Sequence, residues 1–187
     1  MKKVLQTAVL LLLTLSLVAC GQPFSSEVVQ SEKPRITTPQ VTGTDLTALL
    51  EGNSDFALAL YKVLKTEKGG NLFYSPYSIT LMMAKAYAGA RGTTEEQMAA
   101  ALEYNLTAEE LHAAFNYLAL ELAKRTAEKD KFNMEVVNDV WGQKDFQFLD
   151  GYLDTLAQNY GAGLRTLDFI TAPDESRKVI NDYIYDQ

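Results

Sequence analysis

The stretch Asn-Leu-Phe-Tyr-Ser-Pro-Tyr-Ser-Ile at residues 71–79, continued by Gly-Ala-Arg-Gly-Thr-Thr at 89–94, decides how this chain is interpreted. Its first apolar residues, 72–74, predict a short strand. Ser75 then predicts a helix N-cap, with Pro76 at the first helical position, where the missing N–H of proline costs nothing. Lys85 is the only formal charge in this helix, which we expect to reach about Ala88. A helix that is apolar on nearly every side is buried on nearly every side, so it should run through the middle of a domain.

Around this helix, apolar periodicity and cap residues predict an alternation of helices with a few strands. Five further helices are expected. The first is capped by Asn53 or Ser54, a short one is opened by Thr93 with Glu96, and a longer one is opened by Thr107 with Glu110. Another covers 148–160, and the last is capped by Thr171 and has not ended at Gln187. Two strands are expected over 134–141 and 164–169, the first from its alternating apolar pattern. The fold class is therefore α+β.

The composition is that of an acidic globular protein. The chain has 187 residues, of which 47% are hydrophobic and 22% charged, and its formal net charge is −7. Removal of a leader that contains Lys2 and Lys3 leaves 15 of the 17 basic residues against 24 acidic ones, a balance of −9. Nucleic acids and anionic head groups repel such a domain, so we expect no nucleic acid as a partner.

The first residues have the pattern of an export signal. Lys2 and Lys3 precede an apolar run over 4–18, which is shorter than a membrane span of about 20 residues. The sequence Leu-Val-Ala-Cys at 17–20 resembles the bacterial lipobox, in which the cysteine is acylated and becomes the new N-terminus. We therefore expect residues 1–19 to be a signal peptide and Cys20 to be a lipid anchor on the outer face of a bacterial membrane. The alternative is an ordinary signal peptide and release to the extracellular space.

The residues after Cys20 predict a tether. Residues 20–44 are rich in Ser, Thr and Pro and show little apolar periodicity, so they are expected to form a flexible spacer. The folded domain is expected over 45–187. Cys20 is the only cysteine of the chain, so no intrachain disulfide can form.

Several segments together resemble one family. Besides the opening stretch, these are Val-Val-Asn-Asp-Val-Trp at 136–141, Asn-Tyr-Gly-Ala at 159–162, Leu-Asp-Phe at 167–169 and Ile-Asn-Asp-Tyr at 180–183. In this order they resemble the N-terminal half of a serpin over roughly residues 50–187. The resemblance implies a partial serpin fold, with the N-terminal helices and the first strands of the main β-sheet. It also implies that the chain is truncated in the helix that crosses the sheet.

The resemblance implies a function for the full-length protein. Serpins are monomers that trap serine proteases, and some cysteine proteases, when the cleaved reactive loop inserts into the main sheet. The reactive loop would follow Gln187, so no reactive bond is present in this chain, and we expect the fragment to inhibit nothing and not to fold stably alone. The alternative is a non-inhibitory serpin that acts as a cell-surface binding module. An enzyme is not expected, and no cofactor is implied.

The resemblance also implies a structural network at the centre of the sheet, often called the shutter. Its positions match Ser75, Ser78 and Asn138, with Asn71 in the same neighbourhood. A buried amide at Asn138 needs partners, since an unpaired one costs about 1–3 kcal/mol, and the two hydroxyls are suitable. The alternative is that Ser75 is only an N-cap, Ser78 a small packing residue and Asn138 solvent-facing.

Motifs for catalysis and metal binding are missing from the sequence. The single histidine, His112, has no nucleophile motif beside it and is expected on the surface. The sequence contains no HExxH motif and no phosphate loop, and the domain has no cysteine for a metal site. No catalytic, cofactor-binding or metal-ligating residue is therefore predicted.

Overall fold

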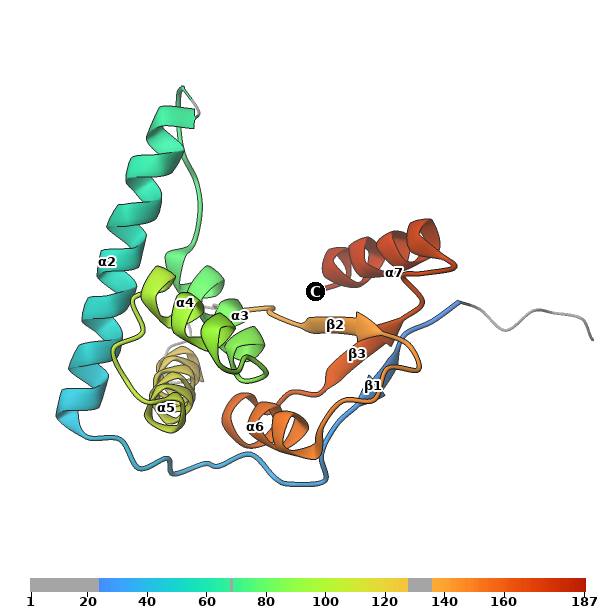
Figure 1. Cartoon of the computed structure of the whole chain (residues 1–187), viewed down its shortest axis with the longest axis horizontal. Helices are drawn as coiled ribbons and strands as arrows, with labels where there is room; N and C mark the ends of the chain where they lie inside the picture. The colour runs from blue at the N-terminus through green and yellow to red at the C-terminus, as the bar shows by residue number, and fades with distance from the viewer. Residues whose placement is uncertain (1–23, 68, 128–135) are drawn as a thin grey trace, which may run out of the picture.

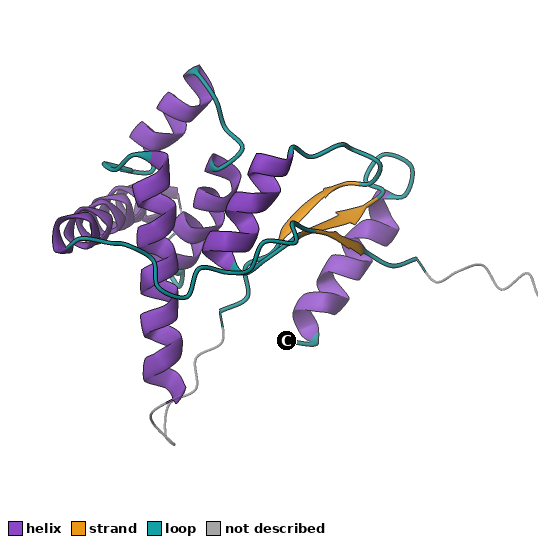
Figure 2. Ribbon diagram, turned by 90° about the horizontal axis from the view of Figure 1, so that it is seen from below, coloured by secondary structure: helices purple, strands orange, loops and turns teal. Residues whose placement is uncertain are grey.

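The computed structural model describes residues 24–67, 69–127 and 136–187, so the predicted signal peptide 1–19 and the lipidation site Cys20 lie outside it. A cluster of helices lies on one side of the molecule, and a small sheet with the last helix lies on the other (Figures 1 and 2). The elements are, in chain order, β1 (Glu27–Val29), α2 (Gly43–Glu67), α3 (Pro76–Tyr87), α4 (Thr93–Ala101), α5 (Ala108–Ala127), β2 (Val140–Gln143), α6 (Asp150–Tyr160), β3 (Leu164–Leu167) and α7 (Pro173–Tyr185).

The sheet has the strand order β1-β3-β2, so β3 is its central strand. β2 runs parallel to β3, with Val140 opposite Leu164, and α6 forms the crossover between them. β1 is antiparallel to β3, with Glu27 opposite Thr166. Successive side chains of a strand point to opposite faces, and Leu164 packs on α6 while the Arg165 side chain reaches Tyr183 of α7. The two helices therefore cover opposite faces of the sheet (Figure 1).

The expected buried helix is confirmed. α3 contacts α2, α4, α5 and β2. Its Ala84 is fully buried, and Leu81 and Tyr87 belong to a core that includes Leu111 and Phe115 of α5. Ser75 caps α3 as predicted, because its Oγ accepts a hydrogen bond from the Ser78 N–H. Burial of this apolar helix is what brings the other helices together.

The capping box at the start of α5 is also confirmed. The Thr107 hydroxyl accepts from the Glu110 N–H, and the Glu110 carboxylate accepts from the Thr107 N–H. The other capping box, at Thr93, is wrong, because α4 has Gly92 at its N-cap and no side chain caps it. Gly92 has φ +60°, a left-handed conformation that glycine adopts without strain.

Two further helix starts differ from the prediction. α2 begins at Gly43, where Thr42 and Asp45 cap each other's N–H groups, and it runs straight through the predicted cap at Asn53. The Asn53 amide oxygen instead accepts from the Thr80 hydroxyl of α3 at 2.7 Å. Thr171 does not cap α7 either, because its hydroxyl donates to the Asp168 carboxylate.

The strands are shorter than predicted, and the structure has none at 72–74. The strand expected over 134–141 is displaced to Val140–Gln143, and Met134 and Glu135 lie outside the described residues. The strand expected over 164–169 ends at Leu167. A strand needs a neighbour for its N–H and C=O groups, and within the described residues pairing extends only as far as these short segments face each other.

The prediction of a flexible spacer up to residue 44 is wrong for residues 24–42, which we call the N-terminal strap. β1 of the strap pairs with β3, and further on the Ile36 N–H donates to the Gln158 carbonyl at 2.8 Å. Arg35 donates from Nε to the Asn116 side chain at 2.9 Å. Composition could not show this, because bonds to residues far along the chain hold the strap, and its Val29 and Val41 pack against the core.

No helix in the described segments combines the length and the apolarity that crossing a membrane requires.

Replacement of Asn116 by alanine tests what holds the strap. Asn116 is fully buried, and its amide binds both Arg35 and the Ile36 carbonyl. We expect Asn116→Ala to weaken docking by about 1–3 kcal/mol, since two polar groups lose their partner. Trypsin should then cut the Arg35–Ile36 bond roughly tenfold faster, because cleavage follows the population of the opened strap.

The matched control is Asn105→Ala, at an exposed position, which should leave the cleavage rate unchanged. Equal rates for both variants would show that Asn116 does not hold the strap.

Candidate functional site

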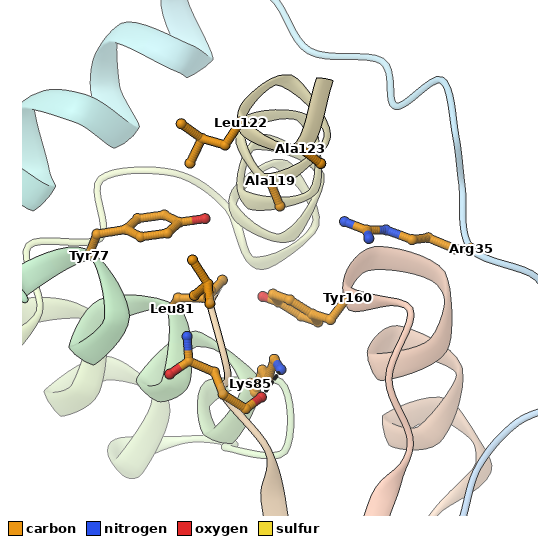
Figure 3. A pocket seen from close by; sticks show the side chains of 10 residues that line it. Arg35, Tyr77, Leu81, Lys85, Ala119, Leu122, Ala123 and Tyr160 are labelled. Atoms are coloured by element: carbon orange, nitrogen blue, oxygen red, sulfur yellow. Dashed lines mark hydrogen bonds between the residues drawn. The ribbon is translucent and has the colours of Figure 1, made fainter. Parts of the chain in front are cut away.

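A cavity of about 240 Å³ lies where the strap, α3, α5, α6 and the segment before β2 meet (Figure 3). Leu81 and Ala119 contribute to its apolar wall. The polar groups around it are Arg35, Tyr77, Lys85, Asn138 and Tyr160. The guanidinium of Arg35 points inward from the strap, and the hydroxyl of Tyr77 points inward from the opposite side (Figure 3). Segments far apart in the sequence therefore build this site together.

Lys85 is the buried cation of the site. Only 5% of the residue is exposed, and its Nζ donates to the backbone carbonyl of Asn138 at 2.5 Å. Nζ also lies 5.5 Å from the ring centroid of Tyr160. Burial lowers the pKa of Lys85, and nearby Arg35 lowers it further, whereas Asp139 opposes the shift. This amine thus joins α3 to the residues that lead into β2.

Arg35 brings a second positive charge to the cavity. Burial lowers its pKa, and the approach of Tyr77 opposes that shift. Burial raises the pKa of Tyr77, while the charge of Arg35 lowers it. The guanidinium is positioned through Nε, which donates to Asn116. Sequence reasoning missed Arg35 because it lies in the segment interpreted as a spacer.

The predicted network of Ser75, Ser78 and Asn138 is only partly assembled. The hydroxyl of Ser75 donates to that of Ser78 at 3.1 Å, which places this pair at the start of α3. The Asn138 amide nitrogen is buried and has no hydrogen-bond partner among the described residues. Asn71 is exposed in the segment before α3. Asn138 is thus half-buried, with its side-chain amide nitrogen shielded from solvent. It is bonded to α3 through its backbone carbonyl, which accepts from Lys85.

The surface position expected for His112 is wrong, since only 5% of the residue is exposed. Its Nδ1 lies 2.6 Å from the Tyr160 hydroxyl, and the two rings meet edge to face. Burial lowers the pKa of His112 to about 4, and the charge of Arg91 contributes to the shift. The histidine is therefore neutral in the fold and ties α5 to α6.

A second cluster, next to the cavity, holds α7 on the sheet. The Asp139 carboxylate accepts from Arg165 Nε at 3.4 Å and from the Tyr183 hydroxyl. The Arg165 guanidinium lies 4.3 Å from the Tyr183 ring centroid and 5.7 Å from that of Trp141. Sequence reasoning missed this cluster. The alternating pattern of 136–141 could have indicated it, because this pattern places Asp139 and Trp141 on the same side of the strand.

The chemistry of the two clusters is structural. The cations are held by an amide, a carbonyl, the Asp139 carboxylate and aromatic rings, and the one histidine is bonded to a tyrosine. In the described part of the chain, no three His, Cys, Asp or Glu side chains gather closely enough to hold a metal ion.

Comparison with known proteins shows where this architecture belongs. The family model described as serpin, a serine protease inhibitor, matches residues 51–187. The chain is 35% identical over 140 residues to the leukocyte elastase inhibitor of Sus scrofa, and equally to that of Homo sapiens. These alignments cover 74% of the chain. The chain belongs to the serpin family.

Solved structures agree on the fold of this serpin. Emu ovalbumin matches 75% of the chain with a TM-score of 0.65 and 23% identity. A tumour-suppressing serpin matches 75% with a TM-score of 0.66 and 22% identity. The helices and the small sheet are thus a partial serpin fold, as the sequence predicted.

The serpin chain spans only part of its relatives. It covers 36% of the length of both elastase inhibitors and 40% of human Serpin B4, to which it is 31% identical. The matched region carries α3, the strands β2 and β3, and α7.

The pH dependence of stability tests the environment of His112. The unfolded state takes up a proton near the ordinary pKa of 6.5, whereas the folded state does so only near 4. The free energy of unfolding should therefore fall as the pH falls from about 6.5 to about 4, in total by about 3 kcal/mol. In the complete protein, the imidazole proton NMR signal that disappears in His112→Gln belongs to this residue and reports its folded pKa.

His112→Gln should flatten the stability profile above pH 5. A midpoint near 6.5 in the NMR titration would contradict the buried pair with Tyr160.

Proposed function

We propose that the complete protein is a serpin-type inhibitor of serine proteases. The observation that carries the proposal is the match of residues 51–187 to the serpin model, together with relatives named for inhibition of leukocyte elastase. The target protease would cleave a reactive loop outside this chain. The loop would insert into the sheet while the protease remains bound as a distorted acyl-enzyme.

The arrangement of the sheet supports this mechanism. In the order β1-β3-β2, one edge of β3 is taken by β1 of the strap, whereas the outer edge of β2 carries no strand among the described residues. An open strand edge presents N–H and C=O groups that can pair with an added strand. Among the described residues the outer edges of β1 and β2 both lack a partner strand, so the sheet could accept a further strand there.

Covalent complex formation tests this function. We expect the complete protein to form a complex with elastase-like, trypsin-like or subtilisin-like protease that survives denaturing electrophoresis, because an acyl bond links the two chains. The same proteases with a chemically blocked active-site serine are the control and should give no complex. The 187-residue chain should give none either.

Simple cleavage of the complete protein by every protease would contradict inhibition of these classes. It would favour the second candidate, a non-inhibitory serpin acting as a binding module. The cavity between Arg35 and Lys85 is the observation that speaks for this candidate, because two partly desolvated cations could hold an acidic ligand.

We also propose that the protein is exported and lipid-anchored through Cys20. The support is the lipobox-like sequence at 17–20 and the position of the only cysteine within it. Acylation of this residue would hold the domain at a membrane surface, since each buried CH₂ of a lipid chain contributes about 0.8 kcal/mol.

Metabolic labelling tests the anchor. In a bacterial host, radiolabelled palmitate should be incorporated into the wild-type chain, and Cys20→Ser should abolish the label because the acyl acceptor is removed. Ser26→Ala, a change outside the lipobox, should retain it. Label in the Cys20→Ser variant, or none in the wild type, would refute the assignment.

A further inference from the structure

Three chain segments meet at the end of the sheet that is farthest from the helical cluster (Figure 1). β2 and β3 are parallel and both end there, with Gln143 opposite Leu167. β1 runs antiparallel to β3, so its start lies at the same end. The Lys144 side chain reaches Glu27 at 3.8 Å, which joins the turn after β2 to the first residue of β1.

This end of the sheet exposes large apolar side chains. Phe24 before β1 is 41% exposed, Phe146 after β2 is 65% exposed and Ile170 after β3 is 77% exposed. We call these three residues the apolar tip. Each comes from a different segment, and the strand pairings bring the segments together. Single exposed apolar residues are ordinary, but a group contributed by three converging segments indicates a contact surface.

Hydrogen bonds hold two of the three segments of the apolar tip, the turns after β2 and β3. The Gln143 side chain bridges its two turns, because Oε1 accepts from the Phe169 N–H at 2.9 Å and Nε2 donates to the Asp168 carboxylate at 3.3 Å. The Asp168 carboxylate also accepts from the Ile170 and Thr171 N–H groups. Ordering these turns costs no further entropy when a partner binds.

The length of chain before the tip identifies its occupant. Phe24 follows Cys20 by four residues, which can span at most about 14 Å when fully extended. A lipid anchor at Cys20 would therefore hold the tip within reach of the head-group layer, where apolar side chains such as Phe can be buried at the acyl boundary. This step rests on the acylation of Cys20 proposed above.

The charges around the apolar tip favour contact with a membrane surface that carries no net charge. Lys144 is balanced by Glu27 and Arg177 by Asp174 in two ion pairs, while Asp145 after β2 and Glu175 in α7 are further exposed acids. With a net charge that is negative overall, the domain is repelled by anionic head groups. Apolar contact, and not charge attraction, must then supply the interaction.

We propose that the apolar tip rests on the lipid surface next to the anchor and orients the domain. The sheet then stands with its β1 start and its β2 and β3 ends against zwitterionic head groups. α2 lies at the other end of the molecule, away from the membrane (Figure 1). The surface thus fixes an orientation that a flexible tether alone would leave free.

Depth-dependent fluorescence quenching tests this orientation without relying on acylation in a cell. The complete protein, processed at Cys20 and with any cysteine after Gln187 replaced by serine, is coupled through the Cys20 thiol to maleimide lipid in phosphatidylcholine vesicles. Phe146→Trp places a reporter on the tip, and Leu58→Trp is the matched control, since Leu58 is 60% exposed on α2. The parent protein, without the introduced tryptophan, gives the background from Trp141 and from any tryptophan after Gln187.

We expect brominated phosphatidylcholine to quench the Phe146→Trp signal several-fold more strongly than the Leu58→Trp signal. The emission of Phe146→Trp should shift to shorter wavelength on coupling, and replacement of phosphatidylcholine by phosphatidylglycerol should weaken both effects. Equal quenching of the two reporters would overturn the proposal. So would a shift that grows with protein concentration in the absence of vesicles, which would assign the tip to a second copy of the chain. Failure of acylation in cells would refute the anchor and leave this result intact.

Discussion

Backbone hydrogen bonding on both edges of β3 is the interaction on which the rest of the structure depends. This strand of four residues pairs with β1, which lies more than a hundred positions earlier in the chain, and with β2. Leu164 and Leu167 are nearly fully buried. Because side chains alternate along the strand, α6 must cover one face and α7 the other. This pairing positions the strap, the apolar tip and the cluster of Asp139, Arg165 and Tyr183 that holds α7 on the sheet.

The polar groups buried around the cavity have a second organising effect. Asn116, Lys85 and His112 each join elements that are distant in sequence, namely the strap to α5, α3 to the approach to β2, and α5 to α6. Buried polar groups are costly unless paired, so each bond admits few alternative arrangements. The Asn138 amide is the exception, since it has no partner among the described residues.

Local pattern predicted much of the fold. Ser75 with Pro76 and the Thr107 box located α3 and α5, because a cap satisfies N–H groups within a few residues. Prediction failed where a side chain or a backbone segment binds a group that is distant in the sequence. Asn53 does not cap a helix, because its amide oxygen accepts a hydrogen bond from the Thr80 hydroxyl of α3. The strap is held by residues far along the chain, such as Asn116. The segment 72–74 has the composition of a strand, but among the described residues it pairs with no other strand.

The sequence by itself determined the family, the α+β class, the buried helix and the acidic character, because ordered motifs, apolar periodicity and charge are properties of the chain alone. Only the tertiary structure decided that the strap is docked, that His112 is buried with Tyr160, that Arg35 and Lys85 face one cavity, and that Phe24, Phe146 and Ile170 share one end of the sheet. The physical reason is that burial, and the pairing that compensates it, depend on which distant segments meet. Sequence spacing does not carry that information.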